Sequence, residues 1–101
     1  MDPVILVTGA NKGIGYSICK ELYLSHPTCQ VVMTARDSQR GENARRDLIA
    51  LFPAGETRLS FCTLDLADAN SILEAVSYVS RTFGELDILI NNAAVCIADK
   101  A

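Results

Sequence analysis

Three glycines near the N-terminus have the spacing of a loop that holds the phosphates of a nucleotide. Gly9, Gly13 and Gly15 follow directly after the apolar residues 4–7. In such a loop the first glycine allows a tight turn, the second lets the backbone approach a ligand, and the third permits close packing of a helix on a strand. Because the helix that follows directs unpaired N–H groups toward an anion, the loop predicts a site for a dinucleotide pyrophosphate.

The spacing G-x3-G-x-G differs from the G-x-G-x-x-G fingerprint, and glycines also fill ordinary turns that bind nothing. A structural turn between a strand and a helix is therefore the alternative interpretation. The context favours the phosphate site, since a β-type run precedes the glycines. After them Ile14, Ile18 and Leu22 recur at helical spacing, which is typical of the apolar face of an amphipathic helix.

Two cations are placed to choose between the nicotinamide dinucleotides. Lys12 lies inside the glycine loop and Arg36 follows the second β-type run. NAD sites usually place an acidic residue there to hold the ribose 2′-OH, whereas an arginine accommodates a 2′-phosphate, so this pair favours NADP(H). Asp37 is a counter-signal, although capping of the next helix explains it equally well. The alternative is that both cations are ordinary surface residues.

Two further positions follow apolar runs. Asp65 and Leu66 come after the third run, where a carboxylate and a backbone amide can hold the edge of an adenine, but a simple helix-entry loop is the alternative. Asn92 ends the fourth run beside the topological switch point, where open α/β sheets bind ligands. Small neighbours leave room there for a ribose, and the asparagine can bond both backbone and ligand.

The rest of the chain alternates β-type runs with helical patterns. Strands are predicted over residues 4–7, 29–34, 59–64 and 86–90. Asp37 and Asp68 are the predicted N-caps of the second and third helices, and Gly84 lies just past the end of the third. The apolar faces of these two helices are predicted to carry Ala44, Leu48 and Leu51 in the second, and Ile72, Ala75, Val76, Val79 and Phe83 in the third, with Arg45, Arg46 and Asp47 facing solvent.

This pattern predicts an α/β fold, a Rossmann-type doubly wound parallel sheet with strand order 3-2-1-4. Right-handed crossovers place the first two helices on one face and the third on the other. The fourth strand would then lie at an open edge, and one face would have a single helix. We therefore expect residues 1–101 to be a truncated part of a larger nucleotide-binding domain, and to self-associate through that edge.

Composition narrows the function classes. The 101 residues are 50% hydrophobic and 21% charged with a net charge of −3, which is typical of a soluble globular protein. Without a basic run, neither nucleic acid nor a membrane is an expected partner. The acidic N-terminus resembles no signal peptide, so a cytoplasmic location is expected. Four scattered cysteines and one loop histidine, His26, predict reduced, mostly buried thiols and no metal site.

Together these motifs resemble the short-chain dehydrogenase/reductase family over essentially the whole chain. The resemblance rests on residues 8–15 and on the strings Thr34-Ala35-Arg36-Asp37, Leu64-Asp65-Leu66 and Asn91-Asn92-Ala93-Ala94. Within the family, Asn11-Lys12 and Arg40-Gly41 are most similar to the NADPH-dependent carbonyl reductases. This similarity implies NADP(H) as cofactor and hydride transfer to a ketone, aldehyde or quinone as the reaction.

The resemblance also implies a role for each matching residue. It assigns Gly9, Gly13, Ile14 and Gly15 to the pyrophosphate, and Lys12 and Arg36 to the 2′-phosphate. Asn11, in the same loop, is also counted as a cofactor-binding residue. Asp65 and Leu66 are assigned to the adenine and Asn92 to the ribose. One departure is Ala94, where the family motif usually ends in glycine, and an added methyl there can crowd the cofactor.

The second departure concerns catalysis. Family members use a serine and a Tyr-x-x-x-Lys pair, and neither is found within the 101 residues. Lys20 follows Tyr16 at the right spacing, but on the first helix, so we expect no substitute there or at Tyr23 or Tyr78. No catalytic residue is predicted, and the chain is expected to be inactive by itself. The alternative to a partial carbonyl reductase is a non-catalytic dinucleotide-binding or interaction module.

Overall fold

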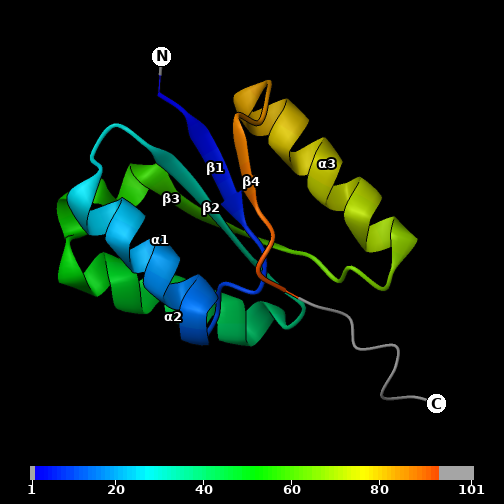
Figure 1. The fold of residues 1–101 in the computed structure, drawn as a ribbon, viewed down its shortest axis with the longest axis horizontal. Helices are drawn as coiled ribbons and strands as arrows, with labels where there is room; N and C mark the ends of the chain where they lie inside the picture. Colours follow the sequence, from blue (N-terminus) through cyan, green and yellow to red (C-terminus); the bar gives the residue numbers. More distant parts are fainter. Residues whose placement is uncertain (1, 94–101) are drawn as a thin grey trace.

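A computed structural model describes residues 2–93 of the chain. Strands and helices alternate along the sequence, as predicted (Figure 1). In chain order the elements are β1 Val4–Val7, α1 Gly13–Ser25, β2 Gln30–Ala35, α2 Ser38–Leu51, the short 3-10 helix η1 Pro53–Arg58, β3 Leu59–Thr63, α3 Ala69–Phe83 and β4 Ile88–Ile90. Each predicted strand is present: β1 has the predicted bounds, and the bounds of the other three differ by at most two residues.

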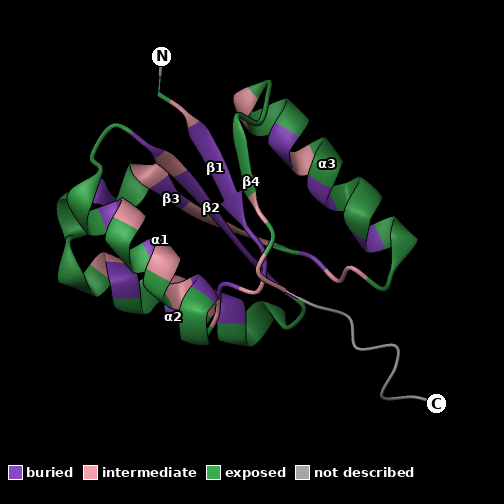
Figure 2. Ribbon diagram, in the orientation of Figure 1, coloured by how far each residue is buried: buried purple, intermediate pink, exposed green. Residues whose placement is uncertain are grey.

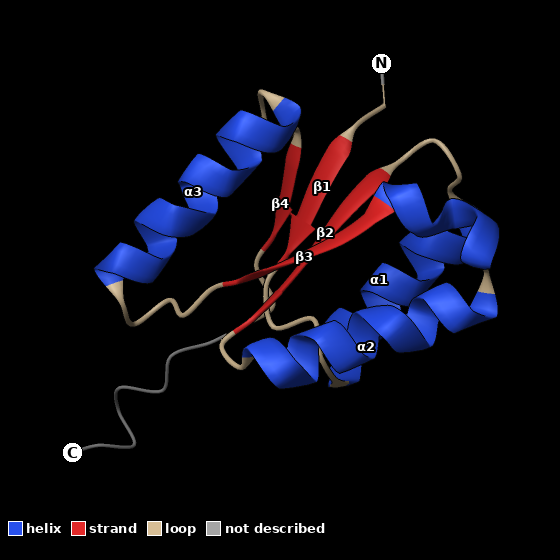
Figure 3. Ribbon diagram, turned by 180° about the vertical axis from the view of Figure 1, so that it is seen from behind, coloured by secondary structure: helices blue, strands red, loops and turns tan. Residues whose placement is uncertain are grey.

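All four strands are parallel and lie in the order β3-β2-β1-β4 (Figure 3), which confirms the predicted topology. Val7, at the end of β1, is aligned with Met33 of β2 and Ile90 of β4. Because every strand runs the same way, the loops that follow them meet at one end of the sheet.

The core has one layer on each side of the sheet. Ile5 and Val7 of β1 pack with Tyr23 of α1 and Leu48 of α2, whereas Val4 and Leu6 belong to the layer that contains Ala75 and Val79 of α3. Figure 2 shows β1 and β2 buried along their length between the helices. Strands covered on both faces need apolar side chains in both directions, which explains their nearly unbroken apolar sequence.

The helices turn different side chains toward the sheet from those predicted. In α1 the buried residues are Gly15, Cys19 and Tyr23, while Ile14 is 72% exposed and Ile18 and Leu22 are only half-buried. The predicted face is thus displaced by one residue. At Gly15 the missing side chain lets α1 lie directly against the glycine loop, where a Cβ would be 2.2 Å from the Gly9 carbonyl oxygen.

A similar correction applies to the two other helices. Leu51 in α2 and Ile72 and Val76 in α3 are exposed, although the other predicted core positions of these helices are buried or half-buried. Within the described residues α3 is the one helix on its side of the sheet, so its apolar stripe is wider than the surface it contacts. Arg45, predicted to face solvent, is half-buried, and its Nε donates to the Leu59 carbonyl at 2.9 Å.

The cysteines and the histidine lie as expected. Cys19 and Cys29 are buried and Cys62 is half-buried, while Cys96 lies outside the described residues. Burial raises the pKa of the Cys19 thiol to about 12 and that of Cys62 to about 11. These two side chains therefore remain protonated and unreactive at neutral pH. His26 is exposed at the C-cap of α1.

Aspartates cap two of the helices, as predicted. Asp37 Oδ1 accepts from Gln39 N at 2.9 Å and from Arg40 N at 3.0 Å. Asp68 Oδ1 accepts from Asn70 N at 3.0 Å and from Ser71 N at 3.4 Å. The side chains thereby satisfy N–H groups that the helices leave unpaired.

Substitution of Asp68 by alanine is expected to lower the free energy of unfolding by about 1 kcal/mol, because both N–H groups lose their acceptor. Asp68→Asn is the matched control and is expected to recover most of the loss, since asparagine caps equally well. Urea unfolding followed by circular dichroism measures both variants. Equal stability of Asp68→Ala and the parent chain would contradict the capping role.

Candidate functional site

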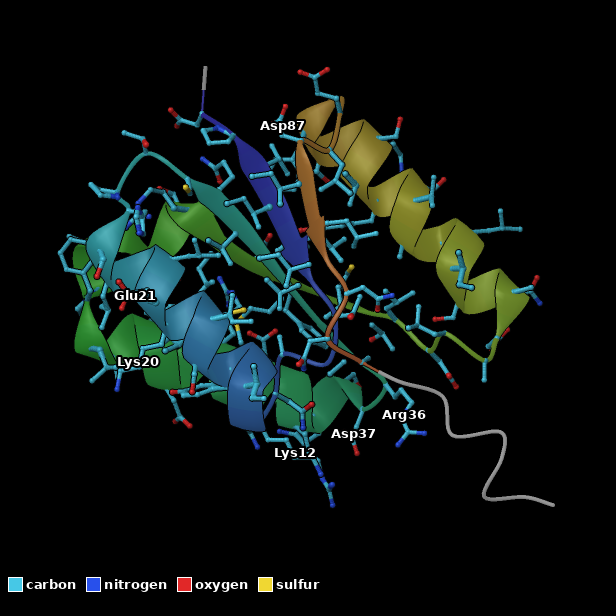
Figure 4. All side chains as sticks on the ribbon, viewed as in Figure 1. Lys12, Lys20, Glu21, Arg36, Asp37 and Asp87 are labelled. Atoms are coloured by element: carbon cyan, nitrogen blue, oxygen red, sulfur yellow. The ribbon has the colours of Figure 1, made fainter. Side chains whose placement is uncertain are left out.

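The candidate site lies at the end of the sheet where the strands finish. The loop from β1 to α1, the residue after β2 and the residues after β4 all reach this end. Ala10 N donates to the Thr34 carbonyl at 2.8 Å, which ties the loop to the end of β2. Figure 4 shows Lys12, Arg36 and Asp37 at this end of the molecule and Asp87 at the other.

Two of the three loop glycines have a backbone that other residues rarely adopt. Gly9 and Gly13 each have φ of 61°. A Cβ at Gly9 would lie 3.1 Å from that of Ala93, whereas a Cβ at Gly13 would meet nothing within 4 Å. Gly9 is therefore packed against the end of β4, and Gly13 presents bare backbone to open space. This is the arrangement predicted for a turn followed by a ligand-facing position.

The third glycine allows α1 to contact the loop. A Cβ at Gly15 would lie only 2.2 Å from the Gly9 carbonyl oxygen and 2.7 Å from Asn92 Nδ2. Asn92 Nδ2 in turn donates to the same carbonyl oxygen at 3.2 Å. The structure thus brings Gly9, Gly15 and Asn92 into one cluster, in which Asn92 braces the glycine loop.

Thr8 holds this cluster together, a role that sequence reasoning missed. Its Oγ1 accepts from Asn92 N at 2.8 Å and from Ala93 N at 2.9 Å, and donates to Asn91 Oδ1 at 3.1 Å. The side chain is buried, with 3% of its surface exposed. The hydroxyl thereby joins the ends of β1 and β4, which are 83 or more residues apart. The only sign in the sequence was a threonine beside the first glycine.

The N-terminus of α1 differs from those of α2 and α3. Its N-cap, Lys12, is extended with φ of −160° and makes no side-chain capping hydrogen bond, whereas Asp37 and Asp68 cap the other two. Gly13 and Ile14, at the start of α1, are exposed. The first N–H groups of α1 are therefore open to an anionic ligand from outside the helix.

The two predicted cofactor-selecting cations are both exposed at the site, Lys12 at the N-cap and Arg36 directly after β2. The Asp37 carboxylate caps α2 and lies 3.9 Å from Arg40 Nε. This assigns Asp37 to the helix start, which removes the reason to count it as a ligand for a ribose hydroxyl. Asn11, directly before Lys12 in the glycine loop, is half-buried.

Asp65 takes part in the entry to α3. Its backbone N–H donates to Ser71 Oγ at 2.8 Å, and its carboxylate accepts from Ala67 N at 3.0 Å. These contacts match the alternative interpretation of Asp65, in which it belongs to a simple loop that leads into a helix. Leu66 is half-buried in the layer of α3. Leu66 lines the same groove as Thr8 and Asn91. Ala94 lies outside the described residues.

The three tyrosines are held by structural contacts. Burial first, and the Asp47 carboxylate second, raise the pKa of Tyr16, and Lys20 is exposed. Burial raises the pKa of Tyr23, whose hydroxyl donates to the Phe52 carbonyl. A proton donor activated by a lysine needs a lowered pKa, so neither residue resembles one. Tyr78 packs edge-on against Phe83.

Residues 2–93 contain no group of three or more His, Cys, Asp or Glu side chains placed to hold a metal ion. No helix in the described part of the chain is long and apolar enough to cross a membrane.

Comparison with known proteins gives consistent matches. The profile of the family described as short chain dehydrogenase matches residues 3–101. Over 90 residues the chain is 43% identical to (-)-isopiperitenone reductase of Mentha piperita, covering 89% of this chain and 28% of the relative. It is 43% identical over 94 residues to carbonyl reductase [NADPH] 1 of Sus scrofa, covering 91% and 30%.

A solved structure is also similar to this chain. The menthone neomenthol reductase from Mentha piperita superposes with a TM-score of 0.88 at 40% identity, covering 94% of this chain and 32% of that one. The chain thus spans less than a third of the length of each of these three proteins.

Proposed function

The chain belongs to the short-chain dehydrogenase family, and from this membership we propose that it binds NADP(H) as the nucleotide-binding part of an oxidoreductase. The loop between β1 and α1 carries the proposal. There a helix start without a side-chain cap lies beside bare glycine backbone at Gly13, in the cluster braced by Asn92. Exposed N–H groups at such a position fit a pyrophosphate.

In this proposal the pyrophosphate lies on the backbone of Gly13, Ile14 and Gly15, with Gly9 forming the turn beneath it. The exposed side chain of Ile14 leaves this backbone accessible. Lys12, at the N-cap, adds a positive charge where the dipole of α1 already favours an anion. Asn11, the loop residue directly before Lys12, is assigned to the same cofactor-binding surface.

The choice of NADP(H) over NAD(H) is assigned to Lys12 and Arg36. Both are exposed at the end of the sheet, and the nearest acidic residue in sequence, Asp37, is used in capping α2. A guanidinium and an ammonium group can both bind a 2′-phosphate by charge-assisted hydrogen bonds. The similarity to a carbonyl reductase named for NADPH supports this assignment.

The remaining contacts complete the adenosine half. Asp65 and Leu66 are assigned to the adenine, with the carboxylate shared between the ligand and the Ala67 N–H. Asn92 is assigned to the adjacent ribose, and its bond to Gly9 fixes the side chain in place for this contact. Pre-organised groups of this kind lower the entropy lost on binding.

The proposed reaction is reduction of a carbonyl compound. NADPH, when bound, supplies a hydride to the carbonyl carbon of a ketone, aldehyde or quinone. The carbonyl reductase to which the chain is similar supports this substrate class. The described residues bind and orient the cofactor, and the three tyrosines are engaged elsewhere. Hydride transfer is therefore proposed for a protein that joins these residues to a proton donor.

Isothermal titration of the 101-residue chain with NADPH and NADH tests the proposal. We expect NADPH to bind and NADH to bind at least about tenfold more weakly, because NADH lacks the 2′-phosphate. Inorganic phosphate as competitor is expected to weaken NADPH binding. A chain that is folded by circular dichroism yet binds neither dinucleotide would overturn the proposed function.

A further inference from the structure

The segment that joins β3 to α3 is held by hydrogen bonds at nearly every backbone N–H. It leaves the sheet at the end where the glycine loop lies (Figure 1). Leu64 N donates to the Ala35 carbonyl at 2.9 Å. Asp68 N donates to the Asp65 carbonyl at 3.0 Å, and Ala67 N donates to Asp65 Oδ1 at 3.0 Å. Most of the segment is therefore fixed by its own turns and by the end of β2.

A side chain of α3 fixes one further N–H of this segment. Ser71 Oγ accepts from Asp65 N at 2.8 Å, from a residue six positions earlier in the chain. Ser71 is buried in the first turn of α3, with 9% of its surface exposed. Its own N–H donates to the N-cap carboxylate of Asp68 at 3.4 Å. The start of the helix thus holds the serine, and the serine hydroxyl holds the Asp65 peptide.

Leu66 is the exception in this segment. Among residues 64–68, its N–H is the one that donates to no acceptor in the part of the chain that the structure describes. Asp65 accepts from Ala67 through Oδ1, which leaves Oδ2 as a second acceptor. A free acceptor and a free donor on successive residues fit the edge of an adenine, where the N6 amino group donates and N1 accepts.

We propose that Ser71 is a positioning residue for the adenine site, an inference that rests on the proposed function, in which Asp65 and Leu66 bind the adenine. The serine hydroxyl fixes the Asp65 N–H, and with it the directions of the Asp65 carboxylate and of the Leu66 N–H. Without the hydroxyl the Asp65 N–H has lost its acceptor. Because an unpaired N–H is unfavourable, the segment must turn to bring this group to water. That turn moves both adenine contacts together.

Calorimetric titration of the 101-residue chain with NADPH and with its hypoxanthine analogue, deamino-NADPH, tests the proposal. The two dinucleotides share the pyrophosphate and the 2′-phosphate. Hypoxanthine has an oxygen in place of the N6 amino group and a hydrogen on N1, so it can make neither adenine contact. The parent chain is expected to prefer NADPH at least about tenfold. Ser71→Ala is expected to bind NADPH about tenfold more weakly and the analogue almost as well as the parent does, so that the preference disappears.

Three further variants separate positioning from stability. Ser71→Thr keeps the hydroxyl and is expected to restore the preference for NADPH. Ser77→Ala removes a hydroxyl from an exposed position of the same helix and should change neither affinity. Asp68→Ala removes the cap of α3 but keeps the Ser71 hydroxyl, so it should lower the stability of the chain and leave the preference intact.

The outcomes distinguish a failure of this proposal from a failure of the proposed function. A folded parent chain that binds neither dinucleotide overturns both. A parent chain that binds both dinucleotides equally well contradicts the adenine contacts, and the role of Ser71 with them. If Ser71→Ala keeps the parental preference, or loses affinity equally for both dinucleotides, the positioning role alone is wrong.

Discussion

Gly15→Ala is expected to abolish NADPH binding by this chain. The new Cβ would lie 2.2 Å from the Gly9 carbonyl oxygen and 2.7 Å from Asn92 Nδ2. The first neighbour is backbone and cannot rotate away, so α1 must shift or the glycine loop must open. Either movement removes the N–H groups of α1 from the position proposed for the pyrophosphate. A loss of at least about 100-fold in affinity is expected, which corresponds to about 2.7 kcal/mol.

Titration of NADPH against the parent and the variant measures this loss. The variant should also be less stable by about 1–3 kcal/mol, the usual cost of overpacking, so the titration is made at a temperature where circular dichroism shows both chains folded. Gly84→Ala is the matched control, because Gly84 has φ of 87°, meets nothing within 4 Å and ends α3 away from the site. It is expected to lose stability but keep its affinity. A folded Gly15→Ala chain with parental affinity would show that the pyrophosphate does not bind at this loop.

Arg36→Ala is expected to weaken NADPH binding about tenfold to 100-fold and to leave NADH binding nearly unchanged. A hydrogen bond to a charged group contributes about 1.5–3 kcal/mol, and NADH lacks the phosphate that receives it. The side chain is exposed, so its removal leaves no buried charge without a partner. Lys12→Ala is expected to act in the same direction.

Calorimetric titration with 2′,5′-ADP and with 5′-AMP isolates the adenosine half of the cofactor. Arg36→Ala should reduce the affinity for 2′,5′-ADP alone. Arg46→Ala, which removes the same charge from the exposed side of α2, is the control and should change neither affinity. If the affinity for NADH falls as much as that for NADPH, Arg36 supports the fold or the adenine site, and the assignment to the 2′-phosphate is wrong.

Much of the fold follows from local sequence patterns. β1 and β2 are apolar at nearly every position because helices cover both faces of the sheet, and this made the parallel topology predictable. Asp37 and Asp68 were predictable as N-caps because a carboxylate satisfies the N–H groups of the next two or three residues, whatever the tertiary structure.

The rotation of each helix was harder to predict. Periodicity predicted an apolar stripe on α1 that includes Ile14. The buried stripe instead begins at Gly15, which packs against the Gly9 carbonyl and which no hydrophobicity pattern marks. Thr8 was missed for a different reason. Two of the three partners of its hydroxyl are backbone groups, those of Asn92 and Ala93, and backbone partners leave no trace in a sequence.

The bonds of Thr8 also determine when the glycine loop can reach its final form. A ribosome makes residues 8–15 early, but the groups that brace them belong to residues 91–93, which emerge more than 80 residues later. Until then the loop lacks both the hydrogen bonds that Thr8 Oγ1 accepts and the bond from the amide of Asn92. Closing so large a chain segment costs conformational entropy, which is offset only when these late contacts form. A growing chain that already contains every glycine therefore cannot yet hold the nucleotide. The glycine loop is thus made early and completed only once the residues after β4 are present.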